Sequence, residues 1–564
     1  MSGVETAAAR QPGVRGTALA AAGLILVLFL VSLDQTVVGT AMPRIIAELR
    51  GFERYAWVTT AYLLAETAVI PIVGKFGDLY GRKWITVAGV AVFLVGSALC
   101  GLATGMTWLI VARGIQGLGG GMLLATVFTL VADIFPDPAK RAKYQGVFFA
   151  VFALSSVIGP YLGGWITDNL NWRWVFYVNL PLGLLSLGVL PAVLPQSARR
   201  RGVRIDFLGA ATITVAVVAL LLALSWAGEG FAWTSGRVLA GLAVAAAGLA
   251  AFIPIELRAA EPVIPFALFR DRTLAAVSFV MFMVGIAMFG IILYTPLFVQ
   301  GVLGRTATGS GAVLTPLVLT MTAMGIVGGQ LIARTRRVKP FMLFGTVMMT
   351  LGVALLGTLG PGSGTRTVAA FLFVTGVGLG LLLPTTTLAV QTAAGQEQLG
   401  VATAATQFIR SVGATVGTAV IGTLVTGGYA DELAAKTPPG VPPPVVAALQ
   451  DPRILVSEEA LRGFADAAAA FPGGQGAAQR LLEAARAALA GSIQDGFRFV
   501  LVAGTLAVVG ALLAENLRLK EQPAVPPTGE AGAAEGSALT ASVAGNPAEP
   551  AAVAEPAGTA GGRR

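Results

Sequence analysis

Four ionisable residues lie inside long apolar stretches, away from the ends of those stretches: Asp34, Glu66, Arg113 and Arg410. A charged side chain at the centre of a bilayer costs about 3 kcal/mol, so a spanning helix keeps one only where the charge faces protein or water. Asp34 stands in the apolar run 17–40, which exceeds the roughly 20 residues that cross a bilayer. The alternative is a helix end at the membrane surface, but no further charge follows Asp34 as far as Met42. We therefore interpret Asp34 as a titratable group in a polar cavity.

The chemistry open to these residues is proton transfer and the binding of charged solutes. The chain contains no histidine, which excludes His-based metal sites and triads and leaves a proton relay to carboxylates. Two acids and two bases at middle depth form a nearly neutral set. For Arg410, a purely structural ion pair is an equally open interpretation. Polar companions stand about one helical turn from three of the charges: Gln116 beside Arg113, Tyr62 beside Glu66, and Gln407 beside Arg410.

Composition places the chain in the membrane. Its 564 residues are 55% hydrophobic and 12% charged, whereas soluble domains carry about 25% charged residues. The formal net charge of +9 does not indicate nucleic acid, because the basic residues lie mostly in short connections between apolar runs. The single cysteine, Cys100, excludes an intramolecular disulfide.

Apolar runs of spanning length follow one another with short connections, and they predict fourteen transmembrane helices. The elements that must position the charged residues are therefore helices throughout. The predicted spans are 17–40, 56–74, 84–105, 107–131, 143–166, 174–195, 206–227, 237–256, 273–299, 309–333, 340–360, 366–389, 401–426 and 496–514.

The orientation follows from the connections. Lys and Arg concentrate in the even-numbered ones, for example at 199–204 and 334–339, and positive charge marks the cytoplasmic side. We expect a multi-pass protein of the cell membrane with both termini cytoplasmic. The loop 427–494 then faces outward, either as a small amphipathic helical cap or, slightly favoured, as a tolerated insertion. Residues 521–564, rich in Ala, Pro, Gly and Glu, are predicted to be disordered.

Three short motifs combine glycine with charge or proline. In GKFGDLYGRK, residues 74–83, glycines permit close helix packing and a tight turn beside a charge network of Asp78, Arg82 and Lys83. In RGIQGLGGG, residues 113–121, Arg113 lies at a depth close to that of Asp34. In GPYLGG, residues 159–164, proline removes a helix hydrogen bond and glycines allow a neighbouring backbone to approach. A packing kink is the simpler interpretation, and a gating kink is compatible with it.

Together with LDQTVVGTAMP in the first span, these motifs occur in the order found in the major facilitator superfamily, which the chain resembles over about 17–426 and the last span. Fourteen spans resemble the drug:proton antiporter branch of that family. The resemblance implies an all-α polytopic fold of two six-helix bundles plus two inserted helices, with alternating access to a central cavity. The expected parts are a cytoplasmic tail 1–16, a first bundle 17–195, an insert 196–260, a second bundle 261–516 that includes the outer loop, and a tail 517–564.

The resemblance also implies roles for the residues that match the family motifs. Asp34 resembles the proton-coupling carboxylate of the first helix, and Arg113 resembles the fourth-helix arginine linked to proton transfer. The second half departs from the pattern, because GGQLIARTRRVKP after the tenth span has no aspartate, so a symmetric second latch is not expected. A cytoplasmic latch that stabilises the outward-open state matches Gly74, Asp78, Gly81 and Arg82, with Asp133 as partner. The antiporter motif of the fifth helix matches Gly159, Pro160, Gly163 and Gly164.

Glu66 joins Asp34 and Arg113 as a predicted proton-coupling residue, because an organic cation and a proton can compete for its carboxylate. The leading function is a proton-coupled secondary antiporter that exports hydrophobic, cationic drugs or other amphiphiles. Export of a lipid is the alternative within transport. The predicted substrate-binding residues are Glu66, Asp34, Gln116, Tyr62, Gln407 and Arg410.

Other function classes fit the sequence poorly. No nucleophile–base set or phosphate-binding loop indicates an enzyme or an ATP-driven pump. A sensor or scaffold predicts a folded soluble output domain, whereas the C-terminal tail is of low complexity. We expect no metal and no cofactor. The expected partners are protons, small hydrophobic substrates and the lipid bilayer, without nucleic acid, and the protein is expected to be a monomer.

Overall fold

The structure is a computed structural model, and its description covers residues 14–49, 54–195, 206–228, 231–394, 398–437, 446, 449–450, 452–456, 458–469 and 474–519. Within these ranges the regular structure is helical, apart from one isolated bridge between Arg337 and Arg518. Helices dominate because a backbone in lipid must satisfy its own hydrogen bonds.

The helices fall into three groups along the chain. The N-half comprises α1 (Val14–Leu49), α2 (Tyr55–Tyr80), α3 (Arg82–Gly101), α4 (Met106–Ile134), α5 (Pro138–Asn169), α6 (Trp174–Tyr177) and α7 (Asn179–Val193). The insert comprises α8 (Phe207–Gly228) and α9 (Gly236–Arg258). The C-half comprises η2 (Phe266–Arg270), α10 (Arg272–Leu297), η3 (Phe298–Val302), α11 (Ala307–Thr335), α12 (Lys339–Leu356), α13 (Thr365–Ala393), α14 (Leu399–Lys436), η5 (Pro452–Val456), α16 (Glu458–Ala469) and α17 (Gly474–Leu513).

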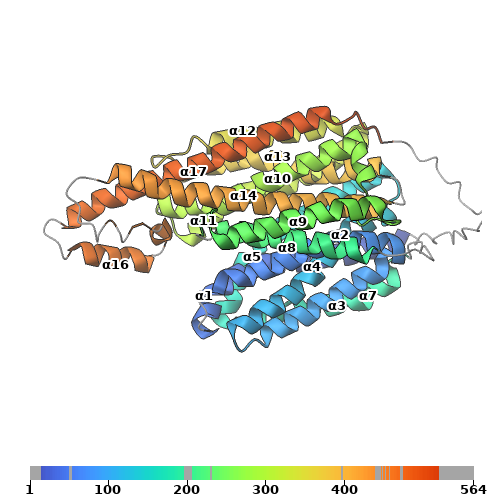
Figure 1. Ribbon diagram of the computed structural model, residues 1–564, viewed down its shortest axis with the longest axis horizontal. Coiled ribbons are helices and arrows are strands. Elements are labelled where there is room, and N and C mark those ends of the chain that lie inside the picture. Colours follow the sequence, from blue (N-terminus) through green and yellow to red (C-terminus); the bar gives the residue numbers. More distant parts are fainter. Residues whose placement is uncertain are drawn as a thin grey trace, which may run out of the picture. The chain divides into compact units, whose positions relative to one another are not determined.

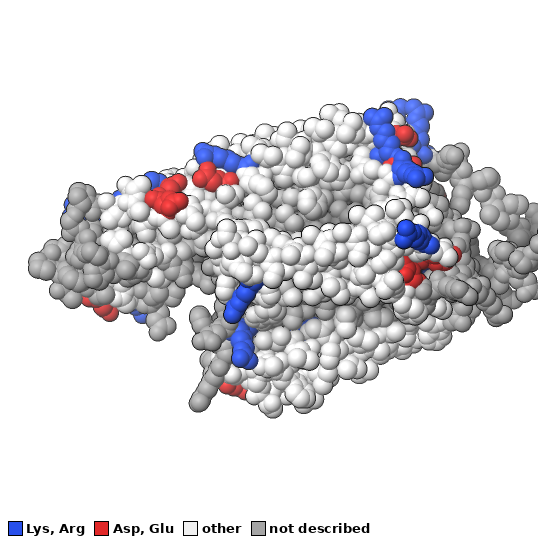
Figure 2. Space-filling view, viewed as in Figure 1, with Lys and Arg blue, Asp and Glu red and all other residues white. Residues whose placement is uncertain are grey.

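The all-α polytopic fold predicted from the sequence is confirmed. Among the described residues, 13 helices are long and apolar enough to cross a membrane. The predicted span 143–166 lies in α5, a further helix of 32 residues that packs between α1 and α11. The helices run side by side along one direction (Figure 1). On the face drawn in Figure 2, charged side chains gather toward the helix ends and leave an uncharged band between them.

The two halves meet mainly along two helix pairs, α2 with α14 and α5 with α11, and α5 also contacts α13 while α4 contacts α14. Glycines bring α5 and α11 into backbone contact. A Cβ at Gly146 would lie 2.8 Å from the carbonyl carbon of Gly325, and one at Gly329 would lie 3.3 Å from that of Ala142. Such contact leaves no space for a side chain. The predicted boundaries between bundles and insert remain predictions.

The insert lies along the line where the halves meet, because α8 packs against both α2 and α14. Its two ends are tied to different halves. Near one end, Lys75 of α2 bonds to Glu261 at 2.5 Å. Near the other end, Trp233 Nε1 donates to Thr423 Oγ1 of α14 at 2.9 Å.

The loop 427–494 is largely helical in its described residues. Helices α14 and α17 have 38 and 40 residues, so each is about 57–60 Å long and exceeds a hydrocarbon core of about 30 Å. They extend past the other helices at the left of Figure 1, where α16 packs on α17. Tyr429 donates to the carbonyl of Leu449 at 2.7 Å, and Leu449, Phe464 and Leu481 are buried. The described residues thus form helices, as the helical-cap alternative predicts, and the outward orientation of the segment stays a prediction.

The termini differ slightly from the predicted boundaries. The predicted tail 517–564 begins too early, because Leu519 N donates to Arg336 O at 2.9 Å and Val338 N donates to Leu517 O at 3.3 Å. These bonds pair the segment that follows α17 with the loop between α11 and α12. The rest of the predicted tail lies outside the described residues. At the other terminus, α1 already begins at Val14, inside the predicted tail 1–16.

Candidate functional site

Helix α4 is held against α2 by glycines, and this contact fixes the depth of its polar residues. A Cβ at Gly117 would lie 2.9 Å from Tyr62 Cα, and one at Gly121 would lie 3.0 Å from the carbonyl carbon of Glu66. Real Cβ atoms do not approach backbone this closely, so the two helices touch only because glycine has no side chain. Arg113 lies on α4 one turn before Gly117, and its side chain reaches Asp34 of α1.

Asp34 lies at the centre of a buried hydrogen-bond network. Arg113 Nη1 bonds to Asp34 Oδ2 at 2.6 Å, while Gln116 Nε2 and Asn179 Nδ2 donate to Asp34 Oδ1 at 2.7 and 2.8 Å. Ser97 Oγ accepts from both amides, at 2.7 and 3.3 Å. Asp34 is 1% exposed and Arg113 is 2% exposed. We call these five residues the polar centre. Because all the donors point at the carboxylate, this arrangement matches its ionised form.

Arg113 is held by more than its ion pair. Its guanidinium lies 4.3 Å from the centroid of the Tyr62 ring, its Nε donates to Val58 O at 3.3 Å, and its Nη1 donates to Gln116 Oε1 at 2.6 Å. Removing one partner of a buried ion pair costs about 3–5 kcal/mol, because the other charge is left uncompensated. Loss of the Asp34 charge would therefore leave the buried guanidinium of Arg113 without a counter-charge.

Glu66 forms a second polar group, on the side of α2 that faces the C-half. Gln35 Nε2 donates to Glu66 Oε2 at 2.8 Å. On α14, Arg410 Nε donates to Gln407 Oε1 at 3.2 Å. Glu66 and Arg410 interact electrostatically, but these two described residues do not form an ion pair. Two opposite charges from different halves thus interact over a distance longer than that of an ion pair.

The predicted latch residues lie together at the junction of α2 and α3, which we call the latch end of the helices. Arg82 bonds to Asp78 at 2.6 Å and also pairs with Asp133 of α4. Asp78 further accepts from the backbone N–H of Gly400 and Val401, at 3.1 and 2.9 Å. These two donors begin α14, so the carboxylate joins the halves at a helix N-terminus, where negative charge is favoured.

Two glycines shape the latch. Gly81 has φ 93°, a left-handed conformation that lets α3 begin directly after α2. Gly74 lies against α14, where a Cβ would be 3.6 Å from the carbonyl carbon of Gly400 and would overlap the side chain of Ala404. Close approach at Gly74 therefore allows Asp78, one turn later, to reach the start of α14.

A second polar contact closes the same end. Gln391 Nε2 of α13 donates to Phe128 O of α4 at 2.9 Å, and Gln145 Nε2 of α5 donates to Gln391 Oε1 at 3.3 Å. All three residues are buried. With the latch, this contact holds the halves together at the latch end.

The antiporter-motif glycines lie on α5 and mostly face α1. A Cβ at Gly159 would overlap Thr36, and one at Gly163 would lie 2.7 Å from Val37 O. The motif therefore packs against the helix that carries Asp34. The expectation of close packing is wrong for Gly164, whose Cβ would have no atom within 4 Å. Pro160 lies within α5, and its side chain is outside the described part.

Outside the spans, an ion pair at Glu48 fixes the C-terminal end of α1, which is the end away from the latch. Arg173 Nη1 bonds to Glu48 Oε1 at 2.5 Å and Trp172 Nε1 donates to Glu48 Oε2 at 2.8 Å. The hydrogen bonds from Arg173 and Trp172 lower the pKa of Glu48. At the latch end, burial lowers the pKa of Arg141 to about 10.

Sequence reasoning missed several polar partners. Ser97 and Asn179 were not predicted, although both are polar residues within apolar runs. Gln145 and Gln391 were also missed. The available signal was an uncharged polar residue at span depth, which is weaker than a charge because a lone amide often bonds to its own helix.

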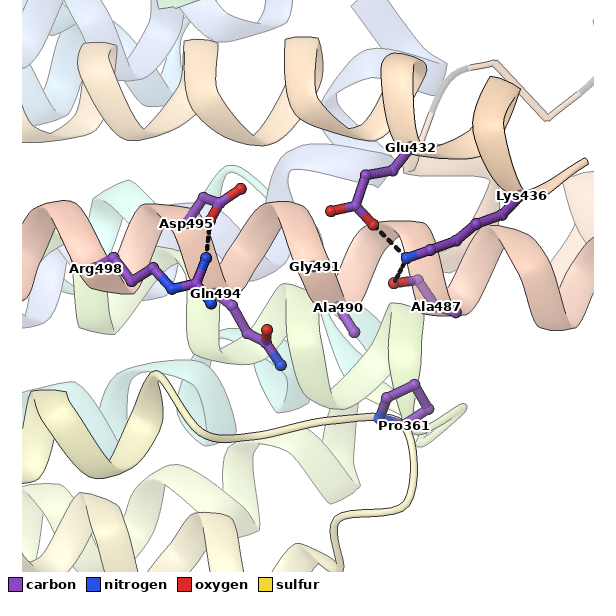
Figure 3. A pocket seen from close by; sticks show the side chains of 9 residues that line it. All are labelled: Pro361, Glu432, Lys436, Ala487, Ala490, Gly491, Gln494, Asp495 and Arg498. Atoms are coloured by element: carbon purple, nitrogen blue, oxygen red, sulfur yellow. Dashed lines mark hydrogen bonds and ion pairs between the residues drawn. The ribbon is translucent and has the colours of Figure 1, made fainter.

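A pocket of about 350 Å³ opens between α14, α17 and the loop at Pro361 (Figure 3). Its charges are already paired, Glu432 with Lys436, and Asp495 with Arg498 at 2.6 Å. The pocket lies away from the buried charges of the spans, and we do not assign the transport site to it.

Known proteins resemble the chain over most of its length. Residues 24–418 match the Major Facilitator Superfamily. The chain is 42% identical over 417 residues to the multidrug transporter protein MdtP of Bacillus subtilis, covering 74% of this chain and 77% of that protein. It is 38% identical over 439 residues to multidrug resistance protein 3 of the same organism, covering 76% and 83%.

Solved structures share the fold at low identity. The human organic anion transporter MFSD10 (TETRAN) superposes with a TM-score of 0.55 at 14% identity, over 88% of this chain and 100% of that one. The proton:xylose symporter XylE superposes with a TM-score of 0.50 at 12% identity, over 74% and 96%. Family and fold indicate a transporter rather than an enzyme. The chain belongs to the major facilitator superfamily.

Proposed function

We propose that this protein is a proton-coupled antiporter of the cell membrane that exports hydrophobic, cationic drugs by alternating access. The Bacillus relatives, which are named for multidrug transport and resistance, support drug efflux. The observation that carries proton coupling is the buried Asp34–Arg113 pair at 2.6 Å. A carboxylate at membrane depth that every neighbour stabilises in its ionised form is a group whose protonation changes the local structure.

Protonation of Asp34 removes the charge that orients three donors. Arg113 then keeps its contacts to Gln116 and to the Tyr62 ring but loses its counter-charge. A buried guanidinium without a counter-charge is costly. The free energy of the N-half therefore falls when Arg113 moves toward water or toward another acid. This fall in free energy drives the conformational change.

Glu66 is the proposed cation site. Its carboxylate faces Arg410 across the halves without a direct ion pair, so an organic cation can take the place of this distant partner. Cation and proton then compete for one carboxylate, which is sufficient for exchange of one for the other. Gln35, Tyr62 and Gln407 would orient the bound cation, while Arg410 would be displaced from the charge of Glu66.

The latch end is proposed to be cytoplasmic, with both termini on that side, because the basic connections lie there. The bonds from Gly400 and Val401 to Asp78 then close the cytoplasmic side. In this conformation three donors point at the Asp34 carboxylate, which fits a transporter that has released its proton.

The test is proton release from the purified, detergent-solubilised protein in weakly buffered solution. Adding tetraphenylphosphonium should release protons from the wild type, and Glu66→Gln should reduce the release. Release on adding a neutral diacylglycerol, with none on adding tetraphenylphosphonium, would favour a lipid exporter. No release with either compound would contradict proton-coupled export.

A further inference from the structure

Asn179 has one amide atom bonded and the other unpaired. Its Nδ2 donates to Asp34 Oδ1 at 2.8 Å and to Ser97 Oγ at 3.3 Å. Its Oδ1 is buried and has no hydrogen-bond partner among the described residues. The whole side chain is 0% exposed. A buried acceptor without a donor is destabilising, so the position calls for an explanation.

The orientation of the amide follows from the charge of Asp34. With Nδ2 toward the carboxylate, a donor meets an acceptor. The reverse orientation would set Oδ1 against Asp34 Oδ1, two acceptors in contact. The unpaired Oδ1 therefore accompanies the ionised state of Asp34.

A protonated Asp34 changes this balance, because its O–H needs an acceptor. Its neighbours in the polar centre mostly offer donors: Arg113 Nη1 and Gln116 Nε2 both point at the carboxylate. Gln116 Oε1 already accepts from Arg113. The vacant acceptor is Asn179 Oδ1, and a half-turn about χ2 brings it to Asp34.

We propose that Asn179 is a positioning residue whose amide reverses with the protonation of Asp34, donating to the carboxylate and accepting from the carboxylic acid. This inference rests on the proposed function, because it assumes that Asp34 carries the transported proton. The amide thus offers a hydrogen bond to Asp34 in both states.

The other titratable and charged groups around Asp34 lie on neighbouring helices and do not offer the same reversal. Arg113 on α4 is always charged and only donates. Tyr62 on α2 and Cys100 on α3 interact electrostatically with Asp34. Cys100 bonds to Gln116, and Glu66 accepts a hydrogen bond from Gln35. Of the two amides that donate to Asp34, Gln116 has its oxygen bonded to Arg113, whereas Asn179 has an oxygen that is free among the described residues and can exchange a donor for an acceptor in place.

The experiment follows the pH dependence of tetraphenylphosphonium-induced proton release from the purified full-length protein. Asn179→Leu has a similar volume and removes both bonds. The bond to the charged form is the stronger one, so the midpoint of release should move upward by about one pH unit, a tenfold gain in proton affinity. Asn179→Asp sets a second carboxylate beside Asp34, and the midpoint should split into two steps.

The control is Asn169→Leu, which changes an exposed asparagine whose Nδ2 donates to Trp165 O at 2.9 Å. Its midpoint should equal that of the wild type. Unchanged midpoints in both Asn179 variants would overturn the inference, and Asn179→Asp keeps the test open if Asn179→Leu does not fold. Loss of release in Asp34→Asn together with unshifted Asn179 variants refutes only the role of Asn179. Release of the wild-type number of protons from Asp34→Asn would assign the released proton to Glu66 alone and refute Asp34 as the proposed proton site.

Discussion

Replacing Asp78 with alanine should open the latch end of the transporter. Asp78 accepts from the N–H groups of Gly400 and Val401 at 3.1 and 2.9 Å, and its side chain is 7% exposed. These bonds exist only while the halves are together at this end. The bond between Asp78 and Arg82 lies within the N-half, so it persists when the halves separate and does not count toward the latch.

The magnitude follows from the two bonds across the halves. A hydrogen bond to a charged group contributes about 1.5–3 kcal/mol, so two of them at the lower value give about 3 kcal/mol. A bias of this size changes the ratio of latched to unlatched molecules by about 150-fold. Asp78→Asn keeps one acceptor oxygen and loses the charge, so its effect should lie between those of alanine and wild type.

The assay is the distance between spin labels on opposite halves at the latch end. Cysteines at Lys140 and Arg337 are suitable, because both positions are exposed and the native Cys100 is buried. The wild type should show the shorter distance and Asp78→Ala a dominant longer one. Asp271→Ala is the matched control, because Asp271 also accepts two backbone N–H bonds at a helix start, from Thr273 and Leu274 of its own α10.

Asp271→Ala should lower thermal stability and leave the distance distribution unchanged. If Asp78→Ala shows the wild-type distribution, the two bonds do not hold the halves together and the latch reasoning is refuted. If both variants shift the distribution equally, the effect reflects general destabilisation and not the contact across the halves.

Three further predictions address the cation site, the helix contacts and the topology. Glu66→Gln should weaken binding of tetraphenylphosphonium at least tenfold and that of a neutral dye much less, measured by fluorescence titration, because only the cation needs the charge. Equal losses would refute Glu66 as a cation site and leave it only a role in the proton path with Asp34. Gly146→Val should lower stability by about 1–3 kcal/mol through overpacking against Gly325, measured by thermal unfolding, whereas Gly164→Val on the same helix should have little effect. A reporter inserted in α16 should be accessible from outside the cell and one fused after Leu519 should not, and the same accessibility for both would contradict the proposed orientation.

Much of the fold follows from the sequence, because length and hydropathy alone determine whether a segment can span a bilayer. The two charged residues of the polar centre could also be identified from the sequence, since a charge within an apolar span is rare. Asp34 and Arg113 share a depth that can be read from the spans, and the structure places them 2.6 Å apart. In the latch, the glycine spacing around Asp78 indicated a tight turn, and Gly81 has the positive φ that such a turn requires.

The hydrogen-bond partners within the site could not be predicted, because they depend on how each helix is rotated about its axis and on contacts between segments far apart in the sequence. An apolar helix gives little indication of which side faces which neighbour, so the bonds of Asn179 and Ser97 to the network could not be assigned. The partners of Asp78 in α14 are backbone N–H groups, which carry no sequence signal. Gly164 shows the reverse error, because its sequence context suggested a close contact that its position on α5 does not make.

The central claim is that Asp34 couples export to protons. The most direct measurement is uphill accumulation of tetraphenylphosphonium in proteoliposomes under an imposed pH gradient, comparing Asp34→Asn with Asp168→Asn, which changes an exposed aspartate at the end of α5. The account predicts wild-type accumulation for Asp168→Asn and none for Asp34→Asn, with normal expression and thermal stability in both. Accumulation against the gradient by Asp34→Asn at the wild-type rate would contradict it.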